Sequence, residues 1–254
     1  MTGKFILNNM KLLKNIFARI WALWALVSFV VTFLIIFLPS MFSYFFKDEV
    51  KGQNYFIWVS RVWMQSWLYM IACPVKVIGR ENFEKNKNYV IVYNHNALLD
   101  VPLSAPFVPG GNKTIAKASF GKFPIFGWFY KRGGIMVDRN KENSRVKSYE
   151  AMRTTLKKGI HMCIYPEGTR NRTGNPLKTF YDGAFKLAID AKKEIIPCVI
   201  LGTNKAMPVN KKFYLLPKRL KMIFLSPVSS ENIDTKNLNK KVFDLMVDVF
   251  TKNQ

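Results

Sequence analysis

Apolar and polar residues follow two different patterns along the chain, which divide it into two parts. Residues 20–38 contain no charged side chain. Nineteen helical residues at about 1.5 Å each span close to the hydrocarbon thickness of a bilayer, so this stretch predicts a membrane-embedded helix. A cleaved signal peptide is the alternative, but residues 39–46 offer no small-residue cleavage site, which favours an uncleaved anchor.

A second apolar stretch, residues 56–73, follows a polar interval at residues 47–54. Its polar residues recur at helical spacing, which predicts an amphipathic helix. Basic residues before the first helix place the amino terminus on the cytoplasmic side. If the chemistry is cytoplasmic, the two helices either cross the membrane as a hairpin or lie in one leaflet, with a kink near Pro39. The sequence leaves both arrangements open.

From residue 75 onward, short β-branched and aromatic runs alternate with helical patterns. Seven runs predict strands at residues 75–78, 89–93, 114–118, 134–137, 162–165, 195–201 and 222–225. Helical patterns cover residues 141–158, 184–193 and 238–252. This alternation is typical of an α/β fold with a mostly parallel central sheet flanked by helices. We therefore expect an N-terminal two-helix membrane anchor at residues 1–74 and a globular domain at residues 75–254.

Composition and charge narrow the class of partner. The formal net charge is +23, while 49% of the residues are hydrophobic, including 21 Phe and 6 Trp. Such a charge implies a negatively charged partner, and the apolar fraction favours a membrane surface over nucleic acid. Cys73, Cys163 and Cys198 lie far apart in apolar runs, so we expect packed thiols and no metal site.

The candidate chemistry begins directly after the second predicted strand. His95 lies in the expected strand-to-helix turn, at the carboxyl edge of the sheet where ligands bind. An apolar helical pattern begins at residues 97–99, and Asp100, five residues after His95, falls in the first turn of this helix. The carboxylate could hold one imidazole nitrogen and leave the other free to accept a proton. On spacing alone, a structural hydrogen bond is the simpler interpretation. The other histidine, His161, starts its strand and is expected to be structural.

Two further motifs follow predicted strands at the same edge. The sequence Tyr-Pro-Glu-Gly-Thr-Arg, residues 165–170, offers a glycine, a hydroxyl and a guanidinium that could grip a phosphate. The strand at residues 134–137 ends in Asp138 and Arg139, and Lys117 ends another strand. Lys117, Arg139 and Arg170 together could form a positive wall for a phosphate or an oxyanion.

The ordered set NHNALLD, GIMVDR, YPEGTR and IPCVI resembles the four sequence blocks of the glycerolipid acyltransferases, in particular the bacterial 1-acyl-sn-glycerol-3-phosphate (lysophosphatidic acid) acyltransferases. The resemblance covers residues 75–225. It implies an enzyme bound to the cell membrane, with its acyltransferase domain facing the cytoplasm. Such an enzyme transfers a fatty acyl group from acyl carrier protein or coenzyme A to lysophosphatidic acid, forming phosphatidic acid for phospholipid synthesis. No cofactor is implied, because the thioester is itself a substrate.

The resemblance also implies roles for individual residues. It makes His95 the general base and Asp100 its orienting partner. Residues of the second and third blocks are implied to contact the acceptor, namely Arg139, Glu167, Gly168, Thr169 and Arg170. Because the motifs place no Ser or Cys beside His95, we expect direct transfer in a ternary complex. The aromatic stretch at residues 120–130 suits an acyl groove, docking of the domain on lipid, or plain core packing.

Two positions depart from the family pattern, and other functions stay open. Ser119 stands where a glutamate is common, which bears on the orientation of Lys117, and Asp182 stands where a lysine is usual, which bears on the acceptor. The alternatives are a same-family enzyme for another lysolipid or a lipoamino acid, and a lipid A acyltransferase. A basic, membrane-tethered nucleic-acid binder is the distant alternative, because the sequence shows no zinc, helix-turn-helix or stacking motif.

Overall fold

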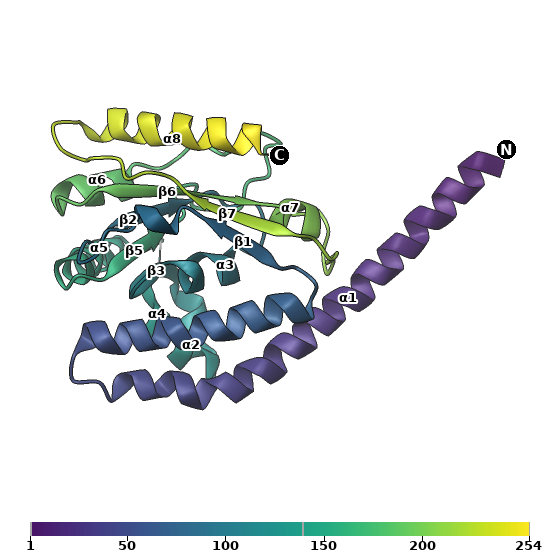
Figure 1. The fold of residues 1–254 in the computed structure, drawn as a ribbon, viewed down its shortest axis with the longest axis horizontal. Helices are drawn as coiled ribbons and strands as arrows, with labels where there is room; N and C mark the ends of the chain where they lie inside the picture. Colours follow the sequence, from purple (N-terminus) through teal and green to yellow (C-terminus); the bar gives the residue numbers. More distant parts are fainter. Residues whose placement is uncertain (1, 139, 254) are drawn as a thin grey trace.

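Two long helices come first in the computed structural model, which describes residues 2–138 and 140–253. They are α1 (Thr2–Met41) and α2 (Glu49–Met70), and they form an antiparallel hairpin beside the globular domain (Figure 1). α1 passes through Pro39, and the chain reverses at residues 42–48. α2 begins inside the interval predicted to separate the helices, because Asp48 accepts hydrogen bonds from the amides of Val50 and Lys51 and caps the helix.

A seven-stranded sheet forms the centre of the domain, in the order β1-β7-β6-β2-β5-β3-β4. The strands are β1 (Val75–Ile78), β2 (Val90–Tyr93), β3 (Asn112–Lys117), β4 (Gly134–Val137), β5 (His161–Ile164), β6 (Ile195–Leu201) and β7 (Leu220–Phe224). Neighbouring strands are parallel except β6 and β7. Every residue of β2, β5 and β6 is buried, as expected for central strands covered on both faces. The prediction of seven strands and a mostly parallel sheet is confirmed.

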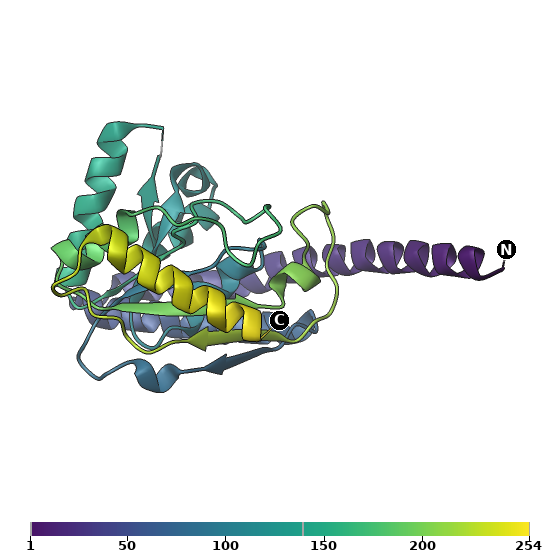
Figure 2. The same cartoon turned by 90° about the horizontal axis from the view of Figure 1, so that it is seen from above.

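Helices cover both faces of the sheet. Figure 1 shows α2, α3 (Asp100–Phe107) and α4 (Phe126–Gly133) on one face, and α6 (Gly183–Asp190) and α8 (Thr235–Lys252) on the other. α5 (Glu142–Lys157) packs with α6 and α8. The shorter helices are α7 (Thr203–Ala206), η1 (Phe42–Tyr44), η2 (Arg80–Asn82) and η3 (Ala118–Lys122). Figure 2 shows that the first part of α1 projects beyond the domain.

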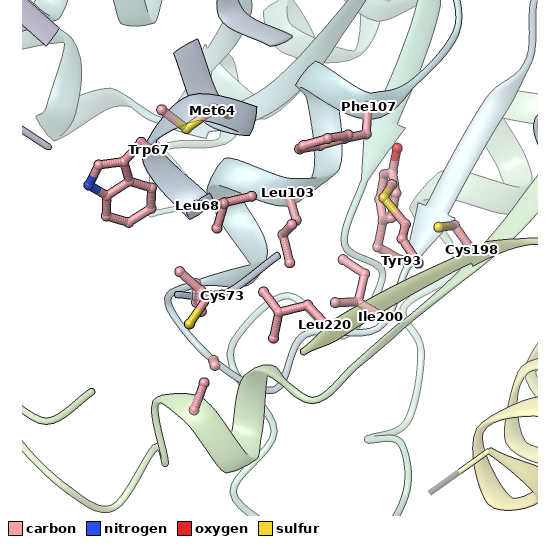
Figure 3. Close-up of a cluster of buried hydrophobic side chains, with 14 of the residues drawn as sticks. Met64, Trp67, Leu68, Cys73, Tyr93, Leu103, Phe107, Cys198, Ile200 and Leu220 are labelled. Carbon is pink, nitrogen blue, oxygen red and sulfur yellow. The ribbon is translucent and has the colours of Figure 1, made fainter. Parts of the chain in front are cut away.

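The hairpin is part of the hydrophobic core. Figure 3 shows Trp67 and Leu68 of α2 in the same buried cluster as Leu103 of α3 and Tyr93 of β2. Such burial removes the apolar surface of both layers from water, which stabilises their association.

Polar groups fix α2 between α1 and the domain. On one side Trp63 Nε1 donates to Thr32 Oγ1 of α1 at 2.9 Å. On the other side Arg61 Nε donates to the Pro106 carbonyl at 2.7 Å, and Gln53 Nε2 donates to the Asn112 carbonyl at 2.7 Å. Of the described helices, only α1 is long and apolar enough to cross a membrane. α2 therefore packs against α1 on one side and against the globular domain on the other, while Trp58, Val62 and Tyr69 remain exposed.

Two glycines with the same backbone conformation test the packing of β1. Gly79 and Gly159 both have φ 83°. A Cβ on Gly79 would overlap the Phe224 carbonyl oxygen, whereas nothing lies within 4 Å of that position on Gly159. Gly159→Ala should therefore lower the free energy of unfolding by about 1 kcal/mol. Gly79→Ala should lower the free energy of unfolding by roughly 1–3 kcal/mol more than Gly159→Ala does, because β1 and β7 must move apart. Equal melting temperatures of the two variants in one detergent would contradict this packing.

Candidate active site

The three predicted motifs meet at one edge of the sheet. β5 lies between β2 and β3, and all three strands run parallel. His95 follows β2, residues 165–170 follow β5, and Lys117 ends β3, so the expected common edge is confirmed. Arg139 was expected at the same edge but lies outside the described residues.

His95 and Asp100 form a hydrogen-bonded pair. The distance between Nδ1 of His95 and Oδ2 of Asp100 is 2.9 Å. The same oxygen accepts the amides of Asn96 and Ala97, each at 2.7 Å. The Asp100 side chain is 0% exposed and the His95 side chain 15%. Since a carboxylate in this position only accepts, the proton belongs on Nδ1, and Nε2 is left as a free acceptor.

The helix after β2 starts later than the sequence pattern predicts. The apolar run at residues 97–99 indicated its first turn, but α3 begins at Asp100. Residues 94–99 instead form a loop that folds around the Asp100 carboxylate. Within this loop, the Asp100 carboxylate gives the amides of Asn96 and Ala97 the hydrogen-bond partners that regular secondary structure does not supply.

Tyr165 supports both members of the pair. Its ring centroid lies 4.5 Å from that of His95. Its hydroxyl donates to the backbone carbonyl of Asp100 at 2.9 Å. Burial raises the pKa of this hydroxyl well above its ordinary value, so it stays a donor. The sequence placed Tyr165 in a motif but gave no signal for this role.

Asn94 fixes the end of β2 against β6. Its Nδ2 donates to the Ile200 carbonyl at 2.9 Å, and its Oδ1 accepts the Ile200 amide at 2.7 Å. The side chain is fully buried, and its two hydrogen bonds to the Ile200 backbone resemble those between neighbouring strands. The fourth sequence block, which ends at Ile200, therefore positions the residue next to His95.

Glu167 joins the two loops of the site. One carboxylate oxygen accepts the His95 amide at 2.7 Å, and the other accepts the Lys178 amide at 3.1 Å. The His95 carbonyl in turn accepts the Asn171 amide at 2.6 Å. Burial raises the pKa of Glu167 to about 7, although the two amide bonds act in the opposite direction. The Glu167 carboxylate faces the interior, so its oxygens accept hydrogen bonds from the backbone amides of the two loops.

The other motif residues include cations that follow or end the strands at this edge. Lys178, which the sequence pattern did not single out, donates from Nζ to Thr169 Oγ1 at 3.1 Å. Arg170 is half-buried and Lys117 is exposed. Neither forms an ion pair with any residue that the structure describes. Gly168 has φ 71°, a conformation that suits glycine in a tight turn.

Asp182, the departure from the family pattern, is directed elsewhere. Its Oδ1 accepts a hydrogen bond from Asn239 Nδ2 of α8 at 2.7 Å. The carboxylate therefore links α6 to α8. Ser119 lies in η3, after Lys117.

An apolar cavity opens beside the pair. It has a volume of about 290 Å³ and reaches His95, Tyr165 and Gly168. Its walls come from α1, α2, α3, α4 and β3, with Phe29, Phe56, Trp63, Met64, Phe126 and Phe129 among the lining residues. Of the aromatic stretch at residues 120–130, only part faces this cavity, since Phe123 and Trp128 are exposed. The stretch is therefore divided between side chains that line the cavity, such as Phe126 and Phe129, and side chains that face outward.

The remaining titratable candidates are structural. His161 is buried, its Nδ1 accepts the Tyr89 amide at 3.0 Å, and burial lowers its pKa to about 4. Cys73, Cys163 and Cys198 are buried free thiols, as predicted. In residues 2–138 and 140–253, no three His, Cys, Asp or Glu side chains are grouped to hold a metal ion.

Comparisons with known proteins agree with this geometry. The family model described as Acyltransferase matches residues 74–201. The chain is 32% identical over 186 residues to the 1-acyl-sn-glycerol-3-phosphate acyltransferase of Saccharomyces cerevisiae, covering 70% of this chain and 60% of that protein. It is 30% identical over 189 residues to the 1-acyl-sn-glycerol-3-phosphate acyltransferase alpha of Mus musculus, covering 72% and 65%. The matched part is thus less than two thirds of either relative.

A crystal structure shows the same fold. The 1-acyl-sn-glycerophosphate (LPA) acyltransferase PlsC from Thermotoga maritima superimposes with a TM-score of 0.78, at 22% identity, over 94% of this chain and 96% of that one. The α/β architecture with its N-terminal helices is therefore confirmed. Sequence relatives from a fungus and a mammal support the resemblance without singling out bacterial enzymes.

The pKa of Glu167 gives a testable pH dependence. Between its ordinary value of 4.5 and about 7, the folded protein keeps a proton that the unfolded chain releases. The free energy of unfolding should therefore fall as pH rises through this range. In Glu167→Gln this decrease in the free energy of unfolding, on the order of 1–3 kcal/mol in the wild type, should be absent. Denaturant unfolding in detergent at pH 5 and pH 8 measures this slope, with exposed Glu142→Gln as control. Parallel curves for wild type and Glu167→Gln would contradict the assignment.

Proposed function

The chain belongs to the acyltransferase family, and on this premise we propose that it transfers a fatty acyl group from a thioester to 1-acyl-sn-glycerol-3-phosphate (lysophosphatidic acid), forming phosphatidic acid. One observation carries the proposal: the His95–Asp100 pair lies where an apolar cavity meets the loop of residues 165–170. The proposed base therefore lies between a cavity that suits an acyl chain and a loop that suits an anion.

His95 acts as the general base in this reaction. Its Nε2 accepts the proton of the acceptor hydroxyl while that oxygen attacks the thioester carbonyl, and Asp100 stabilises the imidazolium. When the tetrahedral intermediate collapses, the ester C–O bond remains, the C–S bond breaks, and the leaving thiolate takes up the proton. Ser60 and Ser104 line the cavity but donate to helix carbonyls, which supports direct transfer without an acyl-enzyme.

The acceptor phosphate binds beside the loop of residues 165–170. Arg170, Lys117 and Lys178 supply the positive charge, and the Thr169 hydroxyl supplies a further hydrogen bond. Arg139 belongs to this group by family resemblance. Glu167 acts on the phosphate indirectly, by fixing the loop, and Gly168 lets the backbone turn. Because Asp182 points to α8, it places no negative charge against a phosphate.

The acyl donor and the membrane fit the remaining surfaces. The cavity suits the acyl chain, and the positive protein suits the acidic groups of acyl carrier protein or coenzyme A. α1 exposes large apolar side chains along most of its length. We expect it to attach the enzyme to one leaflet of the cell membrane, with the sheet on the cytoplasmic side.

Substitutions at the two histidines test the mechanism. His95→Ala should lower turnover about 10²–10⁴-fold, and Asp100→Asn by a similar factor, with vesicle association unchanged. His161→Asn keeps an acceptor for the Tyr89 amide and serves as the control, with activity near wild type per folded molecule. Retained turnover in His95→Ala would exclude His95 as the base.

The acceptor is tested by product mass. Labelled acyl donor is offered with lysophosphatidic acid, with lysolipids whose phosphate is a diester, and with a hydroxylated lipoamino acid. We expect phosphatidic acid as the main product. If only one of the other acceptors were acylated, that class of lipid would be the substrate, and the proposal of lysophosphatidic acid would be wrong.

The cavity should also select for acyl-chain length. Gly133 lines the cavity, and a Cβ there would lie 2.9 Å from the Phe56 ring. Gly133→Ala should therefore reduce transfer of long relative to short acyl chains, by roughly tenfold or less. Competition between donors of different length measures the ratio, with Gly159→Ala as a matched control outside the cavity. An unchanged ratio would argue that the acyl chain lies elsewhere.

A further inference from the structure

The segment between β6 and β7 forms a basic surface that the proposed reaction does not use. Residues 203–219 contain five cations and no Asp or Glu. The cations are Lys205, Lys211, Lys212, Lys218 and Arg219, and all are exposed. None forms an ion pair with a residue in the described part of the chain. An acid-free cationic surface of this kind attracts a negatively charged partner.

This segment is attached to α1. The Leu215 amide donates to the Ala18 carbonyl at 3.1 Å, and Lys211 Nζ donates to Asn15 Oδ1 at 3.4 Å. Figures 1 and 2 both show the segment beside the place where α1 leaves the domain. Beyond this place α1 carries exposed apolar side chains, including Leu13, together with the exposed cation Lys14. The apolar arm and the basic segment are therefore neighbours.

An aromatic side chain occupies the tip of the segment. Phe213 is 49% exposed, and its φ of 48° lies in the left-handed region, which bulky residues rarely adopt. The next residue, Tyr214, is buried, and Lys211 Nζ lies 4.3 Å from its ring centroid. An outward ring next to Lys211 and Lys212 matches a bilayer interface, where rings enter the headgroup region and ammonium groups meet phosphates.

The segment also starts at the catalytic edge of the sheet. β6 runs parallel to β2 and pairs with it directly, so residue 202 follows β6 at the edge where His95 follows β2. A membrane contact here would bring the active site close to the lipid surface.

We propose that residues 203–219 are a second membrane contact, in which Lys211 and Lys212 bind anionic lipid headgroups and Phe213 enters the interface. The inference rests on the proposed attachment of α1 to a bilayer. The contact turns the edge that carries His95 toward the lipid that supplies the acceptor. An acidic protein would also satisfy the cations, but the exposed Phe213 and the backbone bond to apolar α1 favour lipid.

A fluorescent label near the tip tests this contact in the full chain. The three native cysteines are buried, so an introduced cysteine is the accessible thiol. Exposed Asn210→Cys keeps Phe213 and both lysines. Leu13→Cys reports on α1, and Lys240→Cys reports on α8, which covers the opposite face of the sheet. Each protein carries an environment-sensitive dye and is added to vesicles of phosphatidylcholine, with or without phosphatidylglycerol.

We expect emission to shift to shorter wavelength, with protection from an aqueous quencher, at positions 13 and 210 but not at 240. Phosphatidylglycerol should strengthen the response at 210. On the Asn210→Cys background, Lys211→Gln and Lys212→Gln should each reduce the ratio of protected to quenched label about fivefold. Phe213→Ser should also reduce it. On the Leu13→Cys background the same substitutions should leave the response unchanged.

The outcomes separate this inference from the proposed attachment. If position 13 responds while 210 behaves like 240, the second contact is wrong and the attachment of α1 stands. If neither position 13 nor 210 responds, both are wrong. If 210 responds to acyl carrier protein but not to vesicles, the basic surface binds protein, and the lipid contact is overturned.

Discussion

One carboxylate oxygen organises the candidate active-site edge of this member of the acyltransferase family. Oδ2 of Asp100 accepts the imidazole Nδ1–H and the amides of Asn96 and Ala97 at a position without solvent exposure. An ionised carboxylate buried without partners would cost several kcal/mol, so the loop closes around it. That closure determines the conformation of the loop, the direction of the His95 ring and the tautomer together. His95 and the loop that supports it are therefore one structural unit.

Hydrogen bonds fix the backbone of His95 as well as its ring. Glu167 accepts its amide, and the Asn171 amide bonds to its carbonyl. Asn94, one residue earlier, pairs with Ile200 of β6. These partners come from the two strands that flank β2, so the strand order itself supplies them. Residues far apart in sequence thus converge on residues 94 and 95, an arrangement that would suit pre-organised catalysis.

The sequence predicts the sheet well because burial leaves a clear pattern. β2, β5 and β6 are covered on both faces, which demands continuous apolar runs. Long-range polar contacts leave no such pattern. The bond from Glu167 to an amide 72 residues away is invisible in the sequence, as is the placement of Lys178 on Thr169. The amphipathic pattern of residues 56–73 likewise gave no sign that Arg61 donates hydrogen bonds to the carbonyls of Pro106 and Val108 at the end of α3.

The cavity walls have a consequence for how such an enzyme can evolve. Phe29 of α1 and Trp63 of α2 line the same cavity as His95, so the hairpin that we propose as the membrane attachment also forms one wall of this cavity. Removing the hairpin would open the cavity to water and uncover an apolar face of the domain. If the proposed function holds, a hairpin grafted from a homologue would change acyl-chain preference and membrane attachment together, and selection on either trait would alter the other.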